Sequence, residues 1–206
     1  MKEFWEEKYS NSDYIYGLKP NEFLMSKLKD FKSGSILFPC DGEGRNSVYF
    51  AKQGFDVVAF DFSQNAKTKA LNMAKNINVR VDYFTADWKD FFTLERFDFV
   101  AIAFAHFKKD ERQEFHKKMM NFLKPDGLLI AEYFSKKQIN NNSGGPKDLD
   151  MLYDIIELKN DFTEYNIIEL YEKQVNLNEG LLHQGKADVV RVVVKKQYGN
   201  ISHNVR

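Results

Sequence analysis

One unit constrains the fold of this chain more than any other, and it spans residues 35–61. A short apolar run over residues 35–39 leads directly into the turn Asp41-Gly42-Glu43-Gly44. Helical spacing follows as far as Gly54, and residues 56–60 have the pattern of a buried strand. Two strands that a helix connects usually pair in parallel. Parallel strands need such a crossover connection, because a short hairpin turn cannot join them. The unit therefore predicts a parallel sheet.

The alternation of strands and helices continues along the chain. Further strand patterns occupy residues 79–84, 97–103, 128–134, 167–175 and 187–195. A helix is expected to begin at Asp110, with Gln113 in the capping-box position, and another over residues 150–158. The last two strand patterns follow each other without a helix and predict an antiparallel pair. We therefore expect an α/β fold: a doubly wound, Rossmann-like seven-stranded sheet, mostly parallel with an antiparallel C-terminal strand, and with helices on both faces.

Charge and cysteine content exclude several kinds of function. Lys plus Arg is 30 and Asp plus Glu is 30, so the formal net charge is zero and we expect no nucleic-acid partner. Cys40 is the single cysteine, and no two histidines lie four positions apart, so we expect no metal site. The longest apolar run near mid-chain, residues 99–105, is far below the ~18 residues of a membrane span. With no apolar signal region at the N-terminus, the chain is predicted to be cytoplasmic and not membrane-bound.

The glycine turn and an acid at the end of the second strand point to a ligand. Glycines let a backbone approach a ligand closely, and the following helix N-terminus offers N–H groups to an anion. Asp61 lies nineteen positions after Gly42, where a carboxylate can accept both hydroxyls of a ribose. The turn alone is also compatible with a tight strand-to-helix connection. Turn and acid together favour a nucleoside-containing ligand.

The third position of the turn pattern separates two kinds of nucleoside ligand. A dinucleotide fingerprint reads Gly-x-Gly-x-x-Gly or Ala, whereas this chain has Ser47 in the third slot. A pyrophosphate is therefore disfavoured relative to a ligand with one carboxylate and no phosphate. S-adenosylmethionine (SAM), with S-adenosylhomocysteine (SAH) as its demethylated product, fits that description.

At this point the sequence resembles a known family. Residues 41–51, Asp-Gly-Glu-Gly-Arg-Asn-Ser-Val-Tyr-Phe-Ala, resemble motif I of class I SAM-dependent methyltransferases, in the branch that includes tellurite-resistance and thiopurine methyltransferase-like proteins. The further matches are Tyr16-Gly17 with Pro20-Asn21, Phe60-Asp61-Phe62-Ser63, Ala86-Asp87-Trp88, residues 123–129, Gly144-Gly145-Pro146 and Leu182-His183-Gln184-Gly185. The chain departs from the family at Phe38, where many members carry an acid, and at Cys40, where many carry glycine.

The resemblance implies a set of residues around the cofactor. The cofactor-binding candidates are Tyr16, Cys40, Asp41, Gly42, Gly44, Arg45, Asp61, Phe62, Asp87 and Trp88. Asp61 is expected to accept the ribose hydroxyls, the alternative being an exposed acid that caps the next helix. Asp87 is expected to be the partner of the adenine amino group unless it only accepts local N–H bonds. Phe62 and Trp88 flank the adenine ring or, alternatively, pack in the core.

The best candidate for a catalytic residue is His106. It follows the fourth strand, at the carboxyl edge where open α/β sheets bind ligands, and it can act as a general base. A structural histidine in a loop is the alternative. His183 is a weaker candidate of the same kind, and His116, among lysines on a helix, is expected to face solvent.

These features predict one domain over residues 1–206. We expect an N-terminal helical cap over residues 1–30, a SAM-binding core over 31–134, and a C-terminal helix and strand pair over 135–198 that completes the sheet. The predicted function is that of a SAM-dependent methyltransferase (EC 2.1.1 class), a monomer or homodimer that moves a methyl group to a small-molecule acceptor by direct in-line displacement. The alternatives are a non-catalytic SAM-binding protein and an NAD-binding oxidoreductase on a similar fold.

Overall fold

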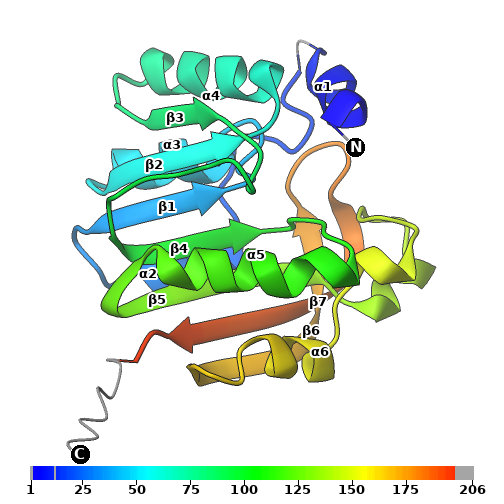
Figure 1. Cartoon of the computed structure of the whole chain (residues 1–206). Helices are drawn as coiled ribbons and strands as arrows, with labels where there is room; N and C mark the ends of the chain where they lie inside the picture. The colour runs from blue at the N-terminus through cyan, green and yellow to red at the C-terminus, as the bar shows by residue number, and fades with distance from the viewer. Residues whose placement is uncertain (1, 12, 198–206) are drawn as a thin grey trace, which may run out of the picture.

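The structure is a computed structural model that describes residues 2–11 and 13–197 (Figure 1). Residues 1, 12 and 198–206 lie outside the described part. The predicted domain over residues 1–206 and its C-terminal segment over 135–198 therefore extend beyond the described residues.

The strands form one sheet of seven, in the order β3-β2-β1-β4-β5-β7-β6. Their bounds are β1 Ser35–Pro39, β2 Asp56–Asp61, β3 Asp82–Thr85, β4 Phe97–Ala103, β5 Leu123–Phe134, β6 Asn166–Asn178 and β7 Gln184–Lys195. Strands β1 to β5 pair in parallel, whereas β7 runs antiparallel to both β5 and β6. The predicted fold class is confirmed. Since the chain moves outward from β1 to β3 and then returns to β4, β1 and β4 flank the point where the strand order reverses.

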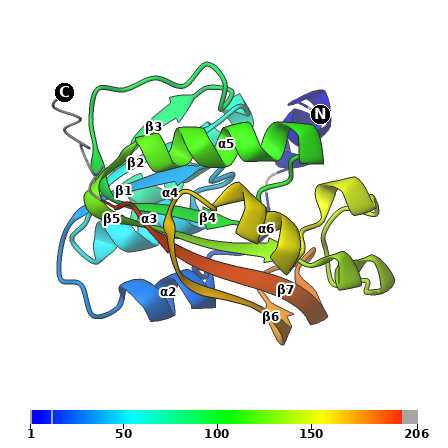
Figure 2. The ribbon, with the colours of Figure 1, turned by 60° about the horizontal axis from the view of Figure 1, so that its bottom comes forward.

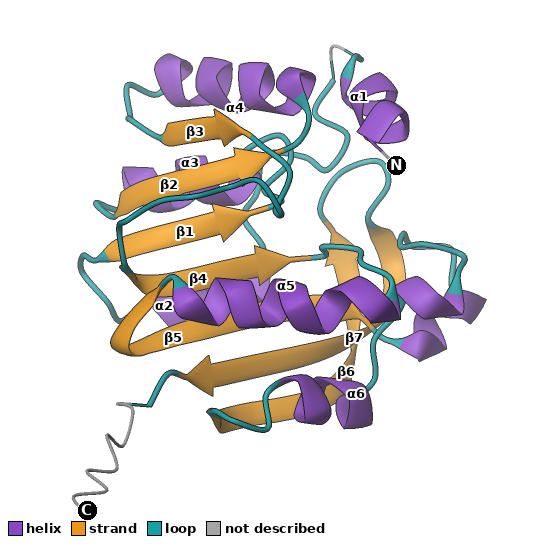
Figure 3. Cartoon of the chain, in the orientation of Figure 1, coloured by secondary structure: helices purple, strands orange, loops and turns teal. Residues whose placement is uncertain are grey.

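The helices cover both faces of the sheet. Their bounds are α1 Lys2–Tyr9, α2 Glu22–Leu28, α3 Arg45–Lys52, α4 Gln64–Asn76, α5 Lys109–Asn121 and α6 Ile155–Asp161, with short 3-10 helices over Lys136–Asn140 and Leu149–Met151. Figures 2 and 3 show α5 and α6 on one face and α2 on the other. Each face has its own apolar core, one that includes Phe115 of α5 and one that includes Phe50 of α3. Because the central strands are covered on both sides, their side chains are apolar in nearly continuous runs.

Two predicted helix starts are wrong. Helix α5 begins at Lys109 after the cap residue Lys108, which makes no side-chain capping bond, so Asp110 and Gln113 form no capping box. The predicted helix over residues 150–158 is a 3-10 turn followed by a separate helix, α6. The side chain of Asp154 explains this break, because it accepts a hydrogen bond from the Glu157 N–H at 2.8 Å and starts a new helix there.

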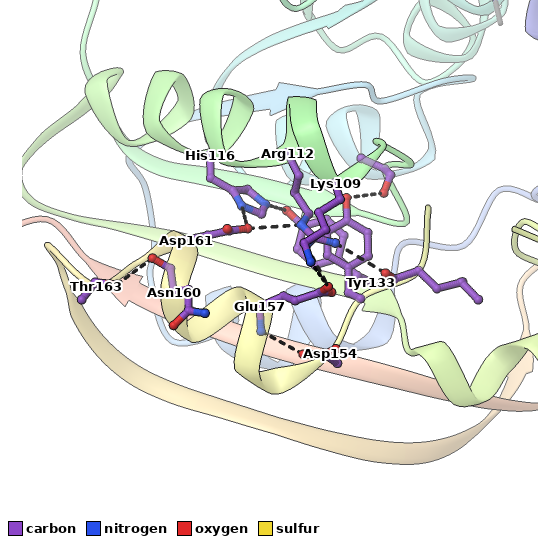
Figure 4. A network of polar contacts seen from close by, with 12 residues as sticks. Lys109, Arg112, His116, Tyr133, Asp154, Glu157, Asn160, Asp161 and Thr163 are labelled. Atoms are coloured by element: carbon purple, nitrogen blue, oxygen red, sulfur yellow. Dashed lines mark hydrogen bonds and ion pairs between the residues drawn. The ribbon is translucent and has the colours of Figure 1, made fainter. Parts of the chain in front are cut away.

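A buried polar network joins α5 to α6 and β5 (Figure 4). The ring of His116 is fully buried: its Nδ1 lies 3.0 Å from Asp161 Oδ2 and its Nε2 lies 3.0 Å from the Tyr133 hydroxyl. Arg112, which is 1% exposed, forms ion pairs with Glu157 and Asp161. The prediction that His116 faces solvent is therefore wrong. Helix α6 packs over this side of α5, and nothing in the local pattern around His116 reveals that cover.

Candidate functional site

A cavity of about 230 Å³ opens at the carboxyl ends of β1, β2 and β4. Helix α1 and the tip of the β6–β7 hairpin also contribute lining residues. These two segments lie near each other at this end of the sheet (Figure 1). Every residue that the sequence singled out for the site lines this cavity except Gly44: Tyr16, Cys40, Asp41, Gly42, Arg45, Asp61, Phe62, Asp87, Trp88 and His106. The cavity therefore occupies the place where open α/β sheets bind ligands.

Asp61 is held in place by backbone groups. Its Oδ2 accepts a hydrogen bond from the Gly42 N–H, and its Oδ1 accepts one from the Ser63 N–H, each at 3.0 Å. The Tyr83 hydroxyl in turn donates to the Gly42 carbonyl at 2.6 Å. Burial raises the pKa of Asp61 to about 6, although the hydrogen bonds from these N–H groups act to lower it. Each carboxylate oxygen keeps a lone pair for hydroxyl donors, so the geometry suits a ribose.

The two turn glycines serve packing within the protein. A Cβ on Gly42 would lie 2.8 Å from the Tyr9 hydroxyl of α1, and one on Gly44 would lie 2.5 Å from the Ala70 Cβ of α4. Both glycines have positive φ, 59° and 87°. An added Cβ on Gly44 would point toward α4, so packing already requires glycine here, and the contact of Gly44 with the cofactor stays a prediction.

Asp41 has an unusual environment. Both of its carboxylate oxygens are buried and have no hydrogen-bond partner among the residues that the structure describes. Burial raises the pKa of Asp41 to about 7, although Ser47 acts to lower it, and the nearby charge of Asp61 acts in the same direction as burial. A cationic ligand group beside Asp41 would offset the cost of burying this carboxylate. Its neighbour Cys40 lies at φ 53°, and burial raises the pKa of its thiol.

The predicted adenine side combines cavity-lining and structural contacts. Asp87 is exposed and accepts the Lys89 N–H at 2.9 Å, which is the local bond considered as its alternative role. Trp88 is 5% exposed and packs edge-on against Phe107 and Phe115 in the core, yet its ring also lines the cavity. Phe62 is half-buried at the same wall. The structure therefore brings these residues together and shows core packing for Trp88.

Part of the cavity lining is aromatic and includes His106. The imidazole stacks between Trp5 and Phe134, with ring centroids at 6.2 and 6.1 Å. Its Nδ1 is buried and unpartnered within the described residues. Burial, followed by the charges of His183 and Lys8, lowers the pKa of His106 to about 3. The ring is therefore neutral at pH 7 and can donate or accept a hydrogen bond, but its basicity is weak.

Two lining residues of α1 were missed in the sequence. Trp5 and Tyr9 lie four positions apart, and this spacing indicated only a helix. Glu179 does not line the cavity but contacts the lining residues Arg45 and His183, and it had no local signal. Arg45, by contrast, was predicted to contact the cofactor, but its guanidinium pairs with Glu179 at 2.9 Å and donates to the Lys19 carbonyl at 3.2 Å. Arg45 therefore holds the hairpin tip against α3 as well as lining the cavity.

Comparisons with known proteins agree with this geometry. The family described as "Methyltransferase domain" matches residues 36–127. Glycine/sarcosine N-methyltransferase of Parasynechococcus marenigrum is 29% identical over 118 residues, covering 54% of this chain and 42% of the relative. Thiocyanate methyltransferase 1 of Brassica oleracea is 33% identical over 118 residues, covering 55% of this chain and 50% of the relative. The match thus spans at most half the length of these curated relatives.

Solved structures share the fold over nearly the whole chain. A structure from work on the conversion of a disulfide bond into a thioacetal group during echinomycin biosynthesis has a TM-score of 0.81 at 15% identity, covering 98% of this chain and 94% of that one. NodS from Bradyrhizobium japonicum, in complex with SAH, has a TM-score of 0.72 at 15% sequence identity, covering 96% of this chain and 98% of that one. TehB from Haemophilus influenzae has a TM-score of 0.69 at 18% sequence identity, covering 95% of this chain and 67% of that one.

The sheet order defines the doubly wound α/β class, and the cavity lies at the strand ends where such sheets bind ligands. The family model matches residues 36–127, which is less than half of the chain, and the solved structures share the fold, so the comparisons support the resemblance to class I SAM-dependent methyltransferases seen in the sequence. Among the described residues, no helix has the length and apolar character needed to span a bilayer. The same residues contain no cluster of three or more His, Cys, Asp or Glu side chains that could hold a metal ion.

Proposed function

We propose that this protein binds SAM and transfers its methyl group to a small-molecule acceptor by direct in-line displacement. The observation that carries the proposal is the pair of buried carboxylates, Asp41 and Asp61, at the point where the strand order reverses. When bound, SAM supplies a positively charged sulfonium that makes its methyl carbon electrophilic. The two relatives are named for glycine or sarcosine and for thiocyanate, which are all small acceptors.

The charge of the cavity supports SAM over NAD. Carboxylates outnumber cationic side chains in the cavity lining: the five acids Asp41, Glu43, Asp61, Asp87 and Glu111 stand against Lys2, Arg45 and Lys89. Glu43 is neutralised by Lys69 at 2.7 Å, but Asp41 has no such partner in the described part of the chain. A pyrophosphate would lie against these acids and be repelled, whereas an ammonium and a sulfonium would be attracted.

The site residues receive roles within this proposal. Asp61 accepts the ribose hydroxyls, and Asp87, Phe62 and Trp88 hold the adenine. Asp41, Gly42 and Tyr16 surround the amino-acid end, while Cys40 and Arg45 line the wall between turn and acceptor. His106 faces the acceptor with its unpartnered Nδ1.

The protein's part in the reaction is mainly to orient the reactants and to exclude water. The aromatic wall of Trp5, Phe104 and Phe107 suits both tasks for a small apolar acceptor. Because the transfer needs no metal and no covalent intermediate, positioning accounts for most of the proposed rate. A cytoplasmic location, a monomeric or homodimeric state and the absence of a nucleic-acid partner stay predictions.

Calorimetry with SAH and with NADH tests the proposal against both alternatives. We expect SAH to bind without added metal and NADH not to bind. Transfer from SAM is then measured with glycine, sarcosine and thiocyanate. NADH binding without SAH binding would support an oxidoreductase, and SAH binding without transfer to any member of a broad acceptor panel would support a non-catalytic SAM-binding protein.

A further inference from the structure

The tip of the β6–β7 hairpin brings a second histidine to the cavity in a catalytic arrangement. We propose that His183, oriented by Glu179, is the group that takes the proton from an acceptor that carries it on oxygen or sulfur, a neutral hydroxyl or thiol compound. This inference rests on the proposed methyl transfer and adds to it the base and the acceptor class.

The hairpin tip fixes the two residues relative to each other. The Glu179 N–H donates to the His183 carbonyl at 3.0 Å, and the His183 N–H donates to the Gly180 carbonyl at 3.3 Å. Between their side chains, Glu179 Oε2 lies 3.3 Å from His183 Nδ1. Glu179 and His183 are 6% and 4% exposed, so the pair is shielded from bulk water.

Arg45 keeps the Glu179 carboxylate charged. Its Nη2 lies 2.9 Å from the same Oε2 that faces His183. Burial by itself would raise the pKa of Glu179, but the bonds to His183 and Arg45 outweigh it and the pKa is lowered. A charged carboxylate accepts a hydrogen, so Nδ1 of His183 carries the ring proton and Nε2 is left with its lone pair.

Nε2 of His183 makes no hydrogen bond to the described residues. The residue lines the cavity, and its imidazole lies between Tyr16 and Phe104, with ring centroids at 4.5 and 4.9 Å. A Cβ on Gly144 would lie 2.6 Å from His183 Cδ2 and 3.2 Å from Nε2, so glycine at this position makes room for this edge of the ring. The late motifs around Gly144 and His183 therefore meet at one place in the structure.

His106 lacks this arrangement. No carboxylate lies within hydrogen-bonding distance of its ring, and it stacks between two aromatic side chains. A base needs an orienting partner that also stabilises the imidazolium once the proton has moved. Glu179 provides that partner for His183 only, and the surrounding rings favour an uncharged acceptor.

The step balances without another reactant. The acceptor's O–H or S–H proton moves to Nε2 of His183, and the electron pair of that bond forms the new bond to the methyl carbon. The bond between the methyl carbon and the sulfonium sulfur breaks, and its electron pair stays on sulfur. The imidazolium beside Glu179 then releases its proton to water when the products leave.

Nitrogen-15 NMR of the histidine rings tests the arrangement without any acceptor. In the wild-type protein, free and with SAH, we expect His183 to carry hydrogen on Nδ1 and none on Nε2. A His183 ring with its hydrogen on Nε2 would overturn the proposal, whatever the activity shows. Calorimetric binding of SAH reports the proposed function separately, since it does not depend on His183 as a base.

Kinetics with matched acceptors test the chemistry. His183→Gln is compared with wild type using 2-mercaptoethanol and phenol, which must lose a proton, and thiocyanate, which has none to lose. We expect transfer to the first two to fall about 10²–10⁴-fold while transfer to thiocyanate and SAH affinity stay within about twofold. An equal loss for all three acceptors, or no loss for the proton-bearing ones, would contradict the assignment. Glu179→Gln, which keeps the side-chain shape, should lower transfer to 2-mercaptoethanol more than to thiocyanate.

Discussion

At the scale of single residues, two buried carboxylates give the cavity its chemistry. Asp61 is oriented by backbone N–H groups from two loops, and Asp41 is buried without a partner among the described residues. Burial raises the pKa of both, to about 6 and about 7. Substitutions can test their roles separately, because Asp61 is assigned to the hydroxyls of the ligand and Asp41 to its positive charge.

Replacing Asp61 with alanine tests the ribose assignment. The variant loses charge-assisted hydrogen bonds worth about 1.5–3 kcal/mol each, so SAH affinity should fall at least about tenfold. Calorimetry measures the dissociation constant, and urea unfolding checks that the variant is folded. Asp61→Asn keeps one acceptor oxygen and should lose less. An unchanged dissociation constant in the alanine variant would show that Asp61 does not hold the ribose.

Asp41→Asn should stabilise the ligand-free protein in a pH-dependent way. The pKa of Asp41 is about 7 in the folded protein and about 3.9 in an unfolded chain, so the folded state binds the extra proton between these values. The wild type therefore loses stability as pH rises from 4 to 7, and asparagine does not. The difference in unfolding free energy, variant minus wild type, should grow over this range to a few kcal/mol and level off above it. Urea unfolding at pH 4, 5.5, 7 and 8.5 measures it, and a constant difference would contradict a buried, unpaired carboxylate.

At the scale of elements, the glycine turn joins β1 to α3 and also sets how closely α3 and α4 approach. The Gly44 Cα faces Ala70, and its positive φ is one that other residues adopt at a cost. The turn therefore allows α3 and α4 to pack closely, and it also lies beside the cavity. A substitution that disturbs the packing should lower stability, whereas one that disturbs the cavity should lower ligand affinity.

Gly44→Ala should mainly destabilise the fold. The added Cβ would lie 2.5 Å from the Ala70 Cβ, and such overpacking costs about 1–3 kcal/mol beyond the backbone strain. Gly54→Ala is the matched control, because Gly54 has a similar φ of +94° while its nearest atom, the Lys32 carbonyl oxygen, lies at 3.8 Å. We expect a larger loss of unfolding free energy for Gly44→Ala in urea. Equal losses would mean that the contact with α4 relaxes freely.

At the scale of the whole molecule, the face of the sheet that α5 and α6 cover and the carboxyl ends of the strands have different tasks. The network of Arg112, His116, Glu157 and Asp161 fastens α6 to α5, and none of these side chains lines the cavity. Stability on this face and ligand binding at the strand ends are therefore separable.

Asp161→Asn should lower stability without changing SAH affinity. It removes the charge that both Arg112 and His116 face, and breaking such a buried pair costs about 3–5 kcal/mol. Asp126→Asn is the control, since its pair with Lys195 is exposed and should contribute no more than about 1 kcal/mol. Thermal unfolding and calorimetry with SAH measure the two properties. A parallel loss of SAH affinity in Asp161→Asn would show that the network also supports the cavity.

The succession of strands and helices and the position of Asp61 at the end of a strand could be predicted from the sequence. They follow from periodicity and from turn residues, which are local: the strand predicted over residues 97–103 is β4. The order of the strands within the sheet, with its reversal between β1 and β4, depends on pairing between segments far apart in the chain. Tertiary structure alone decided that His116 is buried, that Gly44 faces α4, and that Glu179 orients His183 beside Tyr16. Each of these features depends on contacts between segments that are far apart in the chain, including the contact of the β6–β7 hairpin tip with Tyr16. Burial, pKa and hydrogen-bond partners are set by what packs on a residue, and the pattern of its neighbours in sequence does not contain that information.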